Sequence, residues 1–234
     1  MKKILLTLLA IVIVITVAGF AYFEDDYHAD ALAKQAIKGD KQVKVTKIKE
    51  GYKFDGPSKR NAIIFYPGAK VETIAYAPLL KQIAKKDADV FLVDMPLHMA
   101  VLGINKADSI AKAYHYAHYY MAGHSLGAAM ASQYVAKHLD AYQGLILLAG
   151  YPTKDLHHQG FHLLNIYGTH DMDVKSLQKN RQYRPKDYKE VVIKGGNHAQ
   201  FGNYGVQKKD HQATISRGSQ QKQTVQAISK MIHG

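Results

Sequence analysis

The sequence contains no cysteine. This absence excludes disulfide bonds, a thiolate nucleophile and any metal site that depends on cysteine ligands. Acidic residues are also in short supply, because 19 Asp and Glu face 31 Lys and Arg and leave a formal net charge of +12. The basic residues are spread along the chain and form no basic helix or aromatic-basic motif, so we expect a solvated surface facing an anionic envelope, with nucleic-acid binding as the alternative.

Internal repeats, low-complexity tracts and interdomain linkers are missing as well. A chain of 234 residues, 47% of them hydrophobic, is long enough for one well-buried domain and too short for two large ones. From residue 43 onward, short apolar runs alternate with helical patterns. This order predicts an α/β domain over residues 43–234, with a mostly parallel sheet covered by helices on both faces.

The individual elements follow from the spacing of apolar residues. Expected strands lie at 43–54, 61–66, 90–93, 119–122, 145–149, 161–167 and 190–193, and expected helices at 71–86, 108–117, 126–139, 174–181 and 219–232.

An apolar run extends from residue 4 to residue 23 and is interrupted only by Thr7, Thr16 and Gly19. Twenty helical residues cover about 30 Å, the thickness of a hydrocarbon core. Lysines precede the run and Glu24, Asp25 and Asp26 follow it. We therefore expect a single transmembrane anchor over residues 1–24, with a cytoplasmic N-terminus and an extracytoplasmic domain.

Two further expectations concern this end of the chain. Gly19-Phe20-Ala21 is an acceptable cleavage site, so removal of a signal peptide and secretion is the alternative to an anchor. Residues 25–42 contain a weak helical pattern at 27–38 and are expected to form a spacer.

The most informative motif is Gly123-His124-Ser125-Leu126-Gly127. It has the G-x-S-x-G form, preceded by a short apolar segment and followed by an alanine-rich helical pattern. This context is typical of a nucleophile elbow, in which a serine sits on a tight strand-to-helix turn. We therefore predict that Ser125 is a nucleophile and that the N–H of Leu126 is one donor of an oxyanion hole.

A serine nucleophile needs a base and an acid that orients the base. Asp171 follows the strand expected at 161–167, and His198 follows the last expected strand and two glycines. The chain order Ser, Asp, His is the one described for this elbow, and each residue comes at the carboxyl end of a strand. We predict Asp171 as the acid, with Asp173 as the alternative, and His198 as the base.

The remaining histidines are assigned to packing or surface roles. His124 should point away from the nucleophile, and His115 and His118 have helical spacing but no carboxylate partner for a metal. The second oxyanion donor is expected from the loop after residues 61–66, at Ala69 with Gly68 as its neighbour.

Several motifs together carry a family resemblance. They are Tyr66-Pro67-Gly68-Ala69-Lys70-Val71, Asp94-Met95-Pro96, the elbow, the segment 147–152, Tyr167-Gly168-Thr169-His170-Asp171 and the segment 195–205. Over residues 43–232 the chain resembles the alpha/beta hydrolase fold-5 family, and the last motif is the most specific. The resemblance implies an alpha/beta-hydrolase fold with Ser125, Asp171 and His198 as the triad. Dienelactone hydrolases are more distantly similar, and Ser125 stands where they typically have cysteine.

These observations predict a membrane-anchored serine hydrolase that cleaves carboxylic esters or similar acyl compounds, with no cofactor and no metal. About eleven residues, 151–161, connect two expected strands and leave no room for a large lid, so an open site for small or exposed acyl groups is expected. A non-catalytic binding protein of the same fold and an acyltransferase with the same triad are the alternatives.

Overall fold

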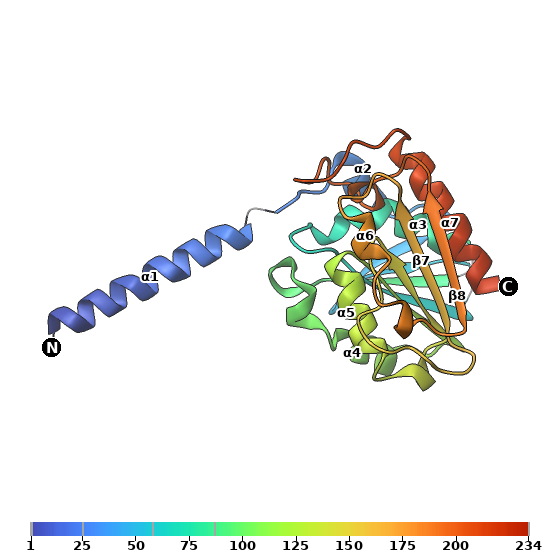
Figure 1. Cartoon of the computed structure of the whole chain (residues 1–234), viewed down its shortest axis with the longest axis horizontal. Helices are drawn as coiled ribbons and strands as arrows, with labels where there is room; N and C mark the ends of the chain where they lie inside the picture. Colours follow the sequence, from blue (N-terminus) through green and yellow to red (C-terminus); the bar gives the residue numbers. More distant parts are fainter. Residues whose placement is uncertain (1, 25, 58, 87, 234) are drawn as a thin grey trace.

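An eight-stranded sheet forms the centre of the protein (Figure 1). The computed structural model describes residues 2–24, 26–57, 59–86 and 88–233. The strand order is β1-β2-β4-β3-β5-β6-β7-β8. β3 to β8 pair in parallel, whereas β1 and β2 are antiparallel to their neighbours, so the expected mostly parallel sheet is confirmed. The strands are β1 (Lys44–Ile48), β2 (Gly51–Asp55), β3 (Asn61–Tyr66), β4 (Ala88–Val93), β5 (His118–His124), β6 (Gly144–Leu148), β7 (His162–Gly168) and β8 (Asp187–Ile193).

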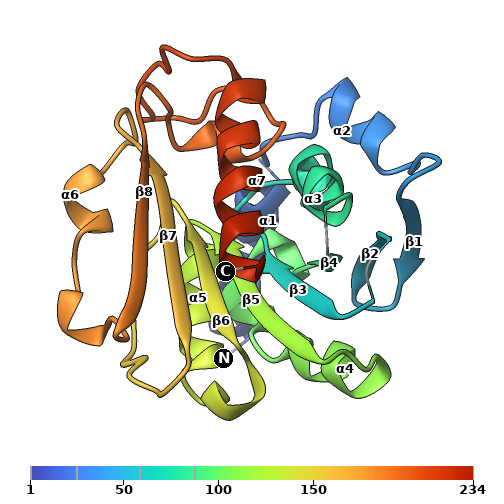
Figure 2. The same ribbon diagram turned by 90° about the vertical axis from the view of Figure 1, so that its right-hand side faces the viewer.

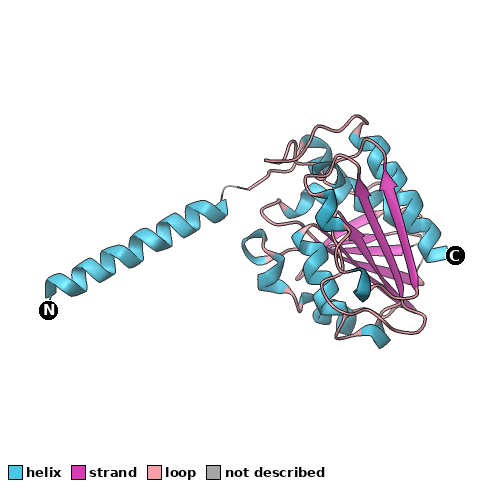
Figure 3. Ribbon diagram, viewed as in Figure 1, coloured by secondary structure: helices cyan, strands magenta, loops and turns pink. Residues whose placement is uncertain are grey.

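Helices cover both faces of the sheet (Figures 2 and 3). α2, α3 and α7 pack on one face, and α4 and α5 on the other. The short α6 lies against β7. The helices are α1 (Lys2–Glu24), α2 (Ala31–Ala36), α3 (Ala77–Ala84), α4 (Lys106–Ala113), α5 (Leu126–Val135), α6 (Val174–Leu177) and α7 (Arg217–His233).

The central strand β3 shows why the sheet is buried on both faces. Its side chains alternate, so Ile63 and Phe65 join the core beneath α3 and α7, while Ile64 and Tyr66 join the core beneath α4 and α5. All four are at most 1% exposed. A continuous apolar run is the pattern expected of such a strand, since both faces exclude water.

The segment expected to be one strand at 43–54 is instead the hairpin β1–β2. The chain reverses at Lys49 and Glu50, directly before Gly51, whose φ of +145° is a conformation that residues with side chains rarely adopt. A Cβ atom at this position would lie 2.1 Å from the carbonyl oxygen of Leu92. Glycine therefore permits both the reversal and the close pairing with β4.

The N-terminal apolar run forms the continuous helix α1, which extends away from the sheet (Figure 1). Within the described part of the chain, no helix is long and apolar enough to cross a membrane. The transmembrane anchor predicted over residues 1–24 is therefore not supported. Asp25, part of the acidic stretch expected after the run, lies outside the described residues.

The segment expected to be a spacer contacts the domain. Tyr27 N–H donates to Lys70 O at 2.8 Å, and Glu72 N–H donates to Tyr27 O at 3.0 Å. The Asp30 carboxylate caps α2 by accepting from Ala33 N–H at 3.0 Å and also contacts Arg217 on α7 at 2.9 Å. Residues 27–36 are thus packed against the loop that follows β3 and against α7.

Candidate active site

Ser125 lies in a strained turn between β5 and α5. Its backbone has φ 53° and ψ −119°, a conformation that costs a residue with a side chain about 1–3 kcal/mol. A Cβ atom on Gly123 would lie 2.5 Å from the carbonyl carbon of Gly127, and one on Gly127 would lie 2.1 Å from Tyr66 O. Ser125 N–H donates to Leu148 O at 3.0 Å and ties the turn to β6. Both motif glycines are therefore required by close backbone contacts, and the serine is held at the carboxyl end of its strand.

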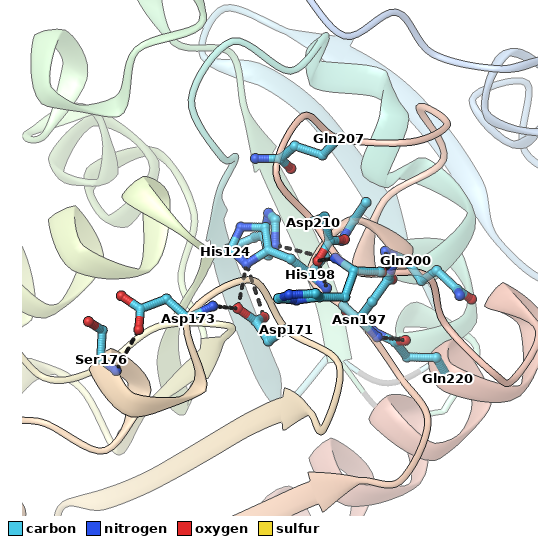
Figure 4. Close-up of polar contacts among 12 residues, drawn as sticks. His124, Asp171, Asp173, Ser176, Asn197, His198, Gln200, Gln207, Asp210 and Gln220 are labelled. Carbon is cyan, nitrogen blue, oxygen red and sulfur yellow. Dashed lines mark hydrogen bonds and ion pairs between the residues drawn. The ribbon is translucent and has the colours of Figure 1, made fainter.

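Asp171 and His198 form a buried pair (Figure 4). His198 Nδ1 lies 3.0 Å from one carboxylate oxygen of Asp171 and 3.2 Å from the other, and both residues are less than 5% exposed. Their loops, which follow β7 and β8, are joined by the His170 N–H, which donates to Gly196 O at 2.8 Å. A Cβ atom on Gly168 would lie 2.1 Å from that same oxygen, so the loops meet only because Gly168 has no side chain.

The alternative acid, Asp173, is engaged elsewhere. Its carboxylate accepts from Ser176 N–H at 3.1 Å and caps α6, and this contact lowers the pKa of Asp173 (Figure 4). The structure therefore brings Asp171, and not Asp173, to His198.

The second ring nitrogen of His198, Nε2, differs from Nδ1 in its hydrogen bonding. A carboxylate can only accept a hydrogen bond from a ring nitrogen that carries a proton, so Nδ1 is the protonated nitrogen of the neutral ring and Nε2 holds the lone pair. Nε2 is buried and has no hydrogen-bond partner among the described residues. Among the described residues, Nε2 therefore forms no hydrogen bond with the Ser125 hydroxyl. His198 lies next to the elbow all the same, since its ring centroid is 4.6 Å from that of His124, the residue before the serine.

The loop after β3 carries the predicted oxyanion donors. Gly68 N–H donates to the hydroxyl of Tyr76 at 3.0 Å and is therefore occupied. Within the described residues, the N–H of Ala69 has no hydrogen-bond partner, and Leu126 N–H is at the first position of α5, where a helix offers no internal acceptor. The next residue of the loop, Lys70, has φ 55° and donates its N–H to His98 O at 3.0 Å. The loop is held in place by its neighbours, and Ala69 is the better placed of the two candidate donors.

His124 is 1% exposed, which agrees with the expected packing role. It does more than fill space, because both ring nitrogens are hydrogen bonded. Nδ1 lies 2.8 Å from the Tyr76 hydroxyl, and Nε2 lies 3.1 Å from the carbonyl oxygen of His198. Burial lowers the pKa of His124 well below its ordinary value of 6.5, and the nearby His198 lowers it further. His124 is therefore neutral in the folded protein.

Sequence reasoning missed two residues that hold the backbone of His198 and of Asn197 before it. Asp210 accepts from His198 N–H at 3.2 Å and from Ala199 N–H at 2.8 Å, and burial raises the pKa of its carboxyl (Figure 4). Gln220 on α7 is fully buried and pairs with Asn197, donating to its carbonyl at 2.8 Å and accepting from its N–H at 3.0 Å. Neither residue belongs to a motif, because an aspartate in a loop and a glutamine on a polar helix are ordinary at the level of sequence.

The described residues contain no group of three or more His, Asp or Glu side chains arranged to hold a metal ion. The candidate site combines a serine in a strained turn, a histidine paired with a buried carboxylate and backbone N–H groups of the loop after β3.

The model of the alpha/beta hydrolase family matches residues 62–222, more than half of the chain. The chain belongs to the alpha/beta hydrolase family. The match extends from β3 into the first third of α7 and includes the elbow and the loops that carry Asp171 and His198. No curated protein sequence matches this alpha/beta hydrolase.

Solved structures of similar fold include several hydrolases. The dienelactone hydrolase from Anabaena variabilis has a TM-score of 0.61 and 12% identity, with 81% of this chain and 96% of that chain covered. Carboxyl esterase 2 from the mycorrhizal fungus Tuber melanosporum has a TM-score of 0.56 and 12% identity, covering 83% and 86%. The mouse alpha/beta hydrolase domain-containing protein 10 has a TM-score of 0.57 and 12% identity, covering 82% and 98%. At these identities the likeness concerns the fold of this alpha/beta hydrolase.

Proposed function

We propose that this alpha/beta hydrolase is a serine hydrolase that cleaves carboxylic esters or related acyl compounds through an acyl-enzyme intermediate. The observation that carries the proposal is the buried pair of His198 and Asp171. Nε2 of His198 makes no hydrogen bond among the described residues, and its ring centroid lies 4.6 Å from that of His124, the residue before the strained Ser125. Membership of the family and the likeness of the fold to an esterase support the same reaction class.

In the proposed reaction, Ser125 Oγ attacks the acyl carbon while His198 Nε2 takes the hydroxyl proton. Asp171 accepts from Nδ1–H, which keeps the lone pair on Nε2 and stabilises the imidazolium that forms. When the tetrahedral intermediate collapses, the bond between the acyl carbon and the leaving oxygen breaks, and His198 gives its proton to that oxygen. Water then attacks the acyl enzyme by the same proton transfers and releases the acid and free Ser125.

The negative charge on the former carbonyl oxygen is stabilised by the N–H groups of Leu126 and Ala69. Each such donor is worth about 3 kcal/mol in the transition state, because it is fixed before the charge develops. The occupied N–H of Gly68 argues for Ala69 as the donor from its loop.

The substrates proposed are small or exposed acyl groups. The connection of residues 149–161 between β6 and β7 contains no helix, so it supplies no helical lid over the site. An alcohol in place of water in the second half of the reaction would make the same acyl enzyme an acyltransferase, and product analysis in the presence of added alcohols distinguishes the two.

We also propose that the domain lies outside the cytoplasmic membrane. The two lysines before the apolar run and the acidic residues after it support this orientation. N-terminal sequencing of the native protein distinguishes a retained α1 from a chain cleaved after residue 21, and a protein recovered only from the cytoplasm contradicts the proposal.

Labelling with a fluorophosphonate probe tests the chemistry. We expect the wild type to be labelled and to hydrolyse short acyl esters, and Ser125→Ala to lose both activities while keeping its fold, as judged by circular dichroism. Asp171→Asn should lower kcat by about 10⁴-fold, because the amide no longer selects the tautomer with a basic Nε2.

Ser125→Ala that is still labelled contradicts the assignment of the nucleophile. A folded wild type that is neither labelled nor active on acyl esters of increasing length contradicts the proposed function and favours a binding protein of the same fold.

A further inference from the structure

A buried chain of hydrogen bonds passes through His124, the residue before Ser125, and joins the loop after β3 to the loop after β8. Gly68 N–H donates to the Tyr76 hydroxyl at 3.0 Å, that hydroxyl lies 2.8 Å from His124 Nδ1, and His124 Nε2 lies 3.1 Å from His198 O. Tyr76 ends the short 3-10 helix Thr73–Tyr76 and is fully buried, and His124 is the last residue of β5. We call these contacts the relay.

Each hydrogen bond of the relay has one possible direction. The carbonyl oxygen of His198 can only accept, so the proton of the neutral His124 ring is on Nε2 and its lone pair is on Nδ1. Tyr76 must therefore donate its hydroxyl proton to Nδ1, and its oxygen is left to accept from Gly68 N–H. A proton added to His124 would face the Tyr76 proton, and burial, which lowers the pKa of His124, opposes that state.

The loop with the proposed oxyanion donor rests directly on the relay. A Cβ atom on Gly68 would lie 2.8 Å from both the Tyr76 hydroxyl oxygen and His124 Nδ1, so there is no room for a side chain between them. The rings of Tyr76 and His124 are 5.6 Å apart, and Phe201 packs on His124 at 5.7 Å. Close packing on all sides leaves these groups little freedom to rearrange.

We propose that Tyr76 and His124 are positioning residues for the proposed serine hydrolase reaction. Through the relay they fix the backbone at Gly68, and hence the adjacent N–H of Ala69, relative to the backbone of His198. Neither residue touches the substrate. They contribute by keeping the oxyanion donor and the base at a fixed distance from each other. This inference rests on the function proposed above.

Tyr76→Phe removes one oxygen atom and leaves Gly68 N–H and His124 Nδ1 without partners in a buried place. If the relay positions the donor and the base, kcat falls because those groups act on the transition state, whereas KM changes little. We expect kcat about tenfold or more lower than in the wild type, with KM within about twofold, since a lost buried partner typically costs enough for such a factor.

Two variants at His124 separate hydrogen bonding from shape. His124→Phe keeps a ring without polar atoms and should lower kcat at least as much as Tyr76→Phe. His124→Gln keeps one donor and one acceptor and should recover part of the loss. The double variant Tyr76→Phe/His124→Phe should be no worse than the poorer single variant, because both changes break one chain of contacts.

Tyr134→Phe is the matched control for a merely structural effect. Tyr134 is 3% exposed on α5, and its hydroxyl donates to Asp108 at 2.6 Å and accepts from Tyr142 at 3.3 Å, so it too loses two buried contacts. Its side chain belongs to the core beneath α4 and α5 and makes no relay contact. We expect a lower Tm but a kcat within about twofold of the wild type.

The experiment measures kcat and KM on a p-nitrophenyl ester of a short acid, counting active sites by the stoichiometry of fluorophosphonate labelling, together with Tm. A labelled wild type with unchanged kcat per site in Tyr76→Phe overturns the relay and leaves the proposed function standing. Equal losses in Tyr134→Phe and Tyr76→Phe overturn it as well, because the effect is then general. If Tyr76→Phe does not fold, the comparison of His124→Gln with His124→Phe tests the relay instead. Equal kcat values in these two variants overturn the relay. A wild type without labelling or turnover refutes the proposed function and the relay with it.

Discussion

Replacing Gln220 by leucine removes both hydrogen bonds by which α7 holds the residue before His198. Leucine is close to glutamine in volume, so the main loss is that of hydrogen bonds. Gln220 is fully buried, and without its amide group the N–H and the C=O of Asn197 have no partner there. Each unpaired buried group costs about 1–3 kcal/mol, so the free energy of unfolding should fall by about 2–6 kcal/mol. Such a loss is a large part of the 5–15 kcal/mol that typically stabilises a domain.

Urea unfolding followed by circular dichroism measures this change as a shift of the midpoint at constant slope. Gln226→Leu is the control, because Gln226 lies on the same helix with an exposed side chain, and its replacement should change stability by no more than about 0.5 kcal/mol. The folded Gln220→Leu protein should also have a lower kcat, since Asn197 is directly linked to the proposed base. Equal stability of Gln220→Leu and the wild type would refute the reasoning, because water or another group would then satisfy Asn197.

Two further predictions concern the elbow. The pKa of His124 is lowered in the folded protein from the ordinary 6.5 of the unfolded chain, so below pH 6.5 the unfolded state takes up a proton that the folded state does not. The wild type should therefore lose about 1.4 kcal/mol of stability per pH unit relative to His124→Gln between about pH 6 and 5, and parallel stability curves for the two proteins would contradict this. Gly127→Ala should destabilise the domain by several kcal/mol or prevent folding, because its Cβ would lie 2.1 Å from Tyr66 O, and a variant with wild-type Tm would show that the elbow can shift.

Much of the sheet could be predicted because burial on both faces produces a simple pattern. The apolar run at residues 61–66 and the glycines around Ser125 follow from local requirements of a buried strand and a tight turn. The β1–β2 hairpin was not predicted, since apolar residues alternate on both sides of Gly51 and hide the reversal. The loops of Asp171 and His198 could be predicted to lie close together because the carboxyl ends of parallel strands meet at one edge of the sheet.

No sequence pattern predicted the contacts that support the candidate site. Tyr76 and His124 are 48 residues apart, and Gln220 is 23 residues from Asn197. Whether such side chains meet depends on the packing of helices on the sheet, and no spacing in the sequence encodes that distance. His124 was predicted to be a packing residue, which its burial confirms, but its two hydrogen bonds could be known only from the structure.

The contact between Tyr27 and Lys70 sets a limit on how far the N-terminus can be trimmed. Tyr27 hydrogen bonds on both sides of Val71, directly after the loop that carries Ala69. A protease that cut within α1 would leave this edge intact, whereas a cut in the exposed turn near Gly39 would free the whole stretch from residue 26 to residue 38 to dissociate. Maturation of the protein at its N-terminus is therefore compatible with a complete site only upstream of Tyr27.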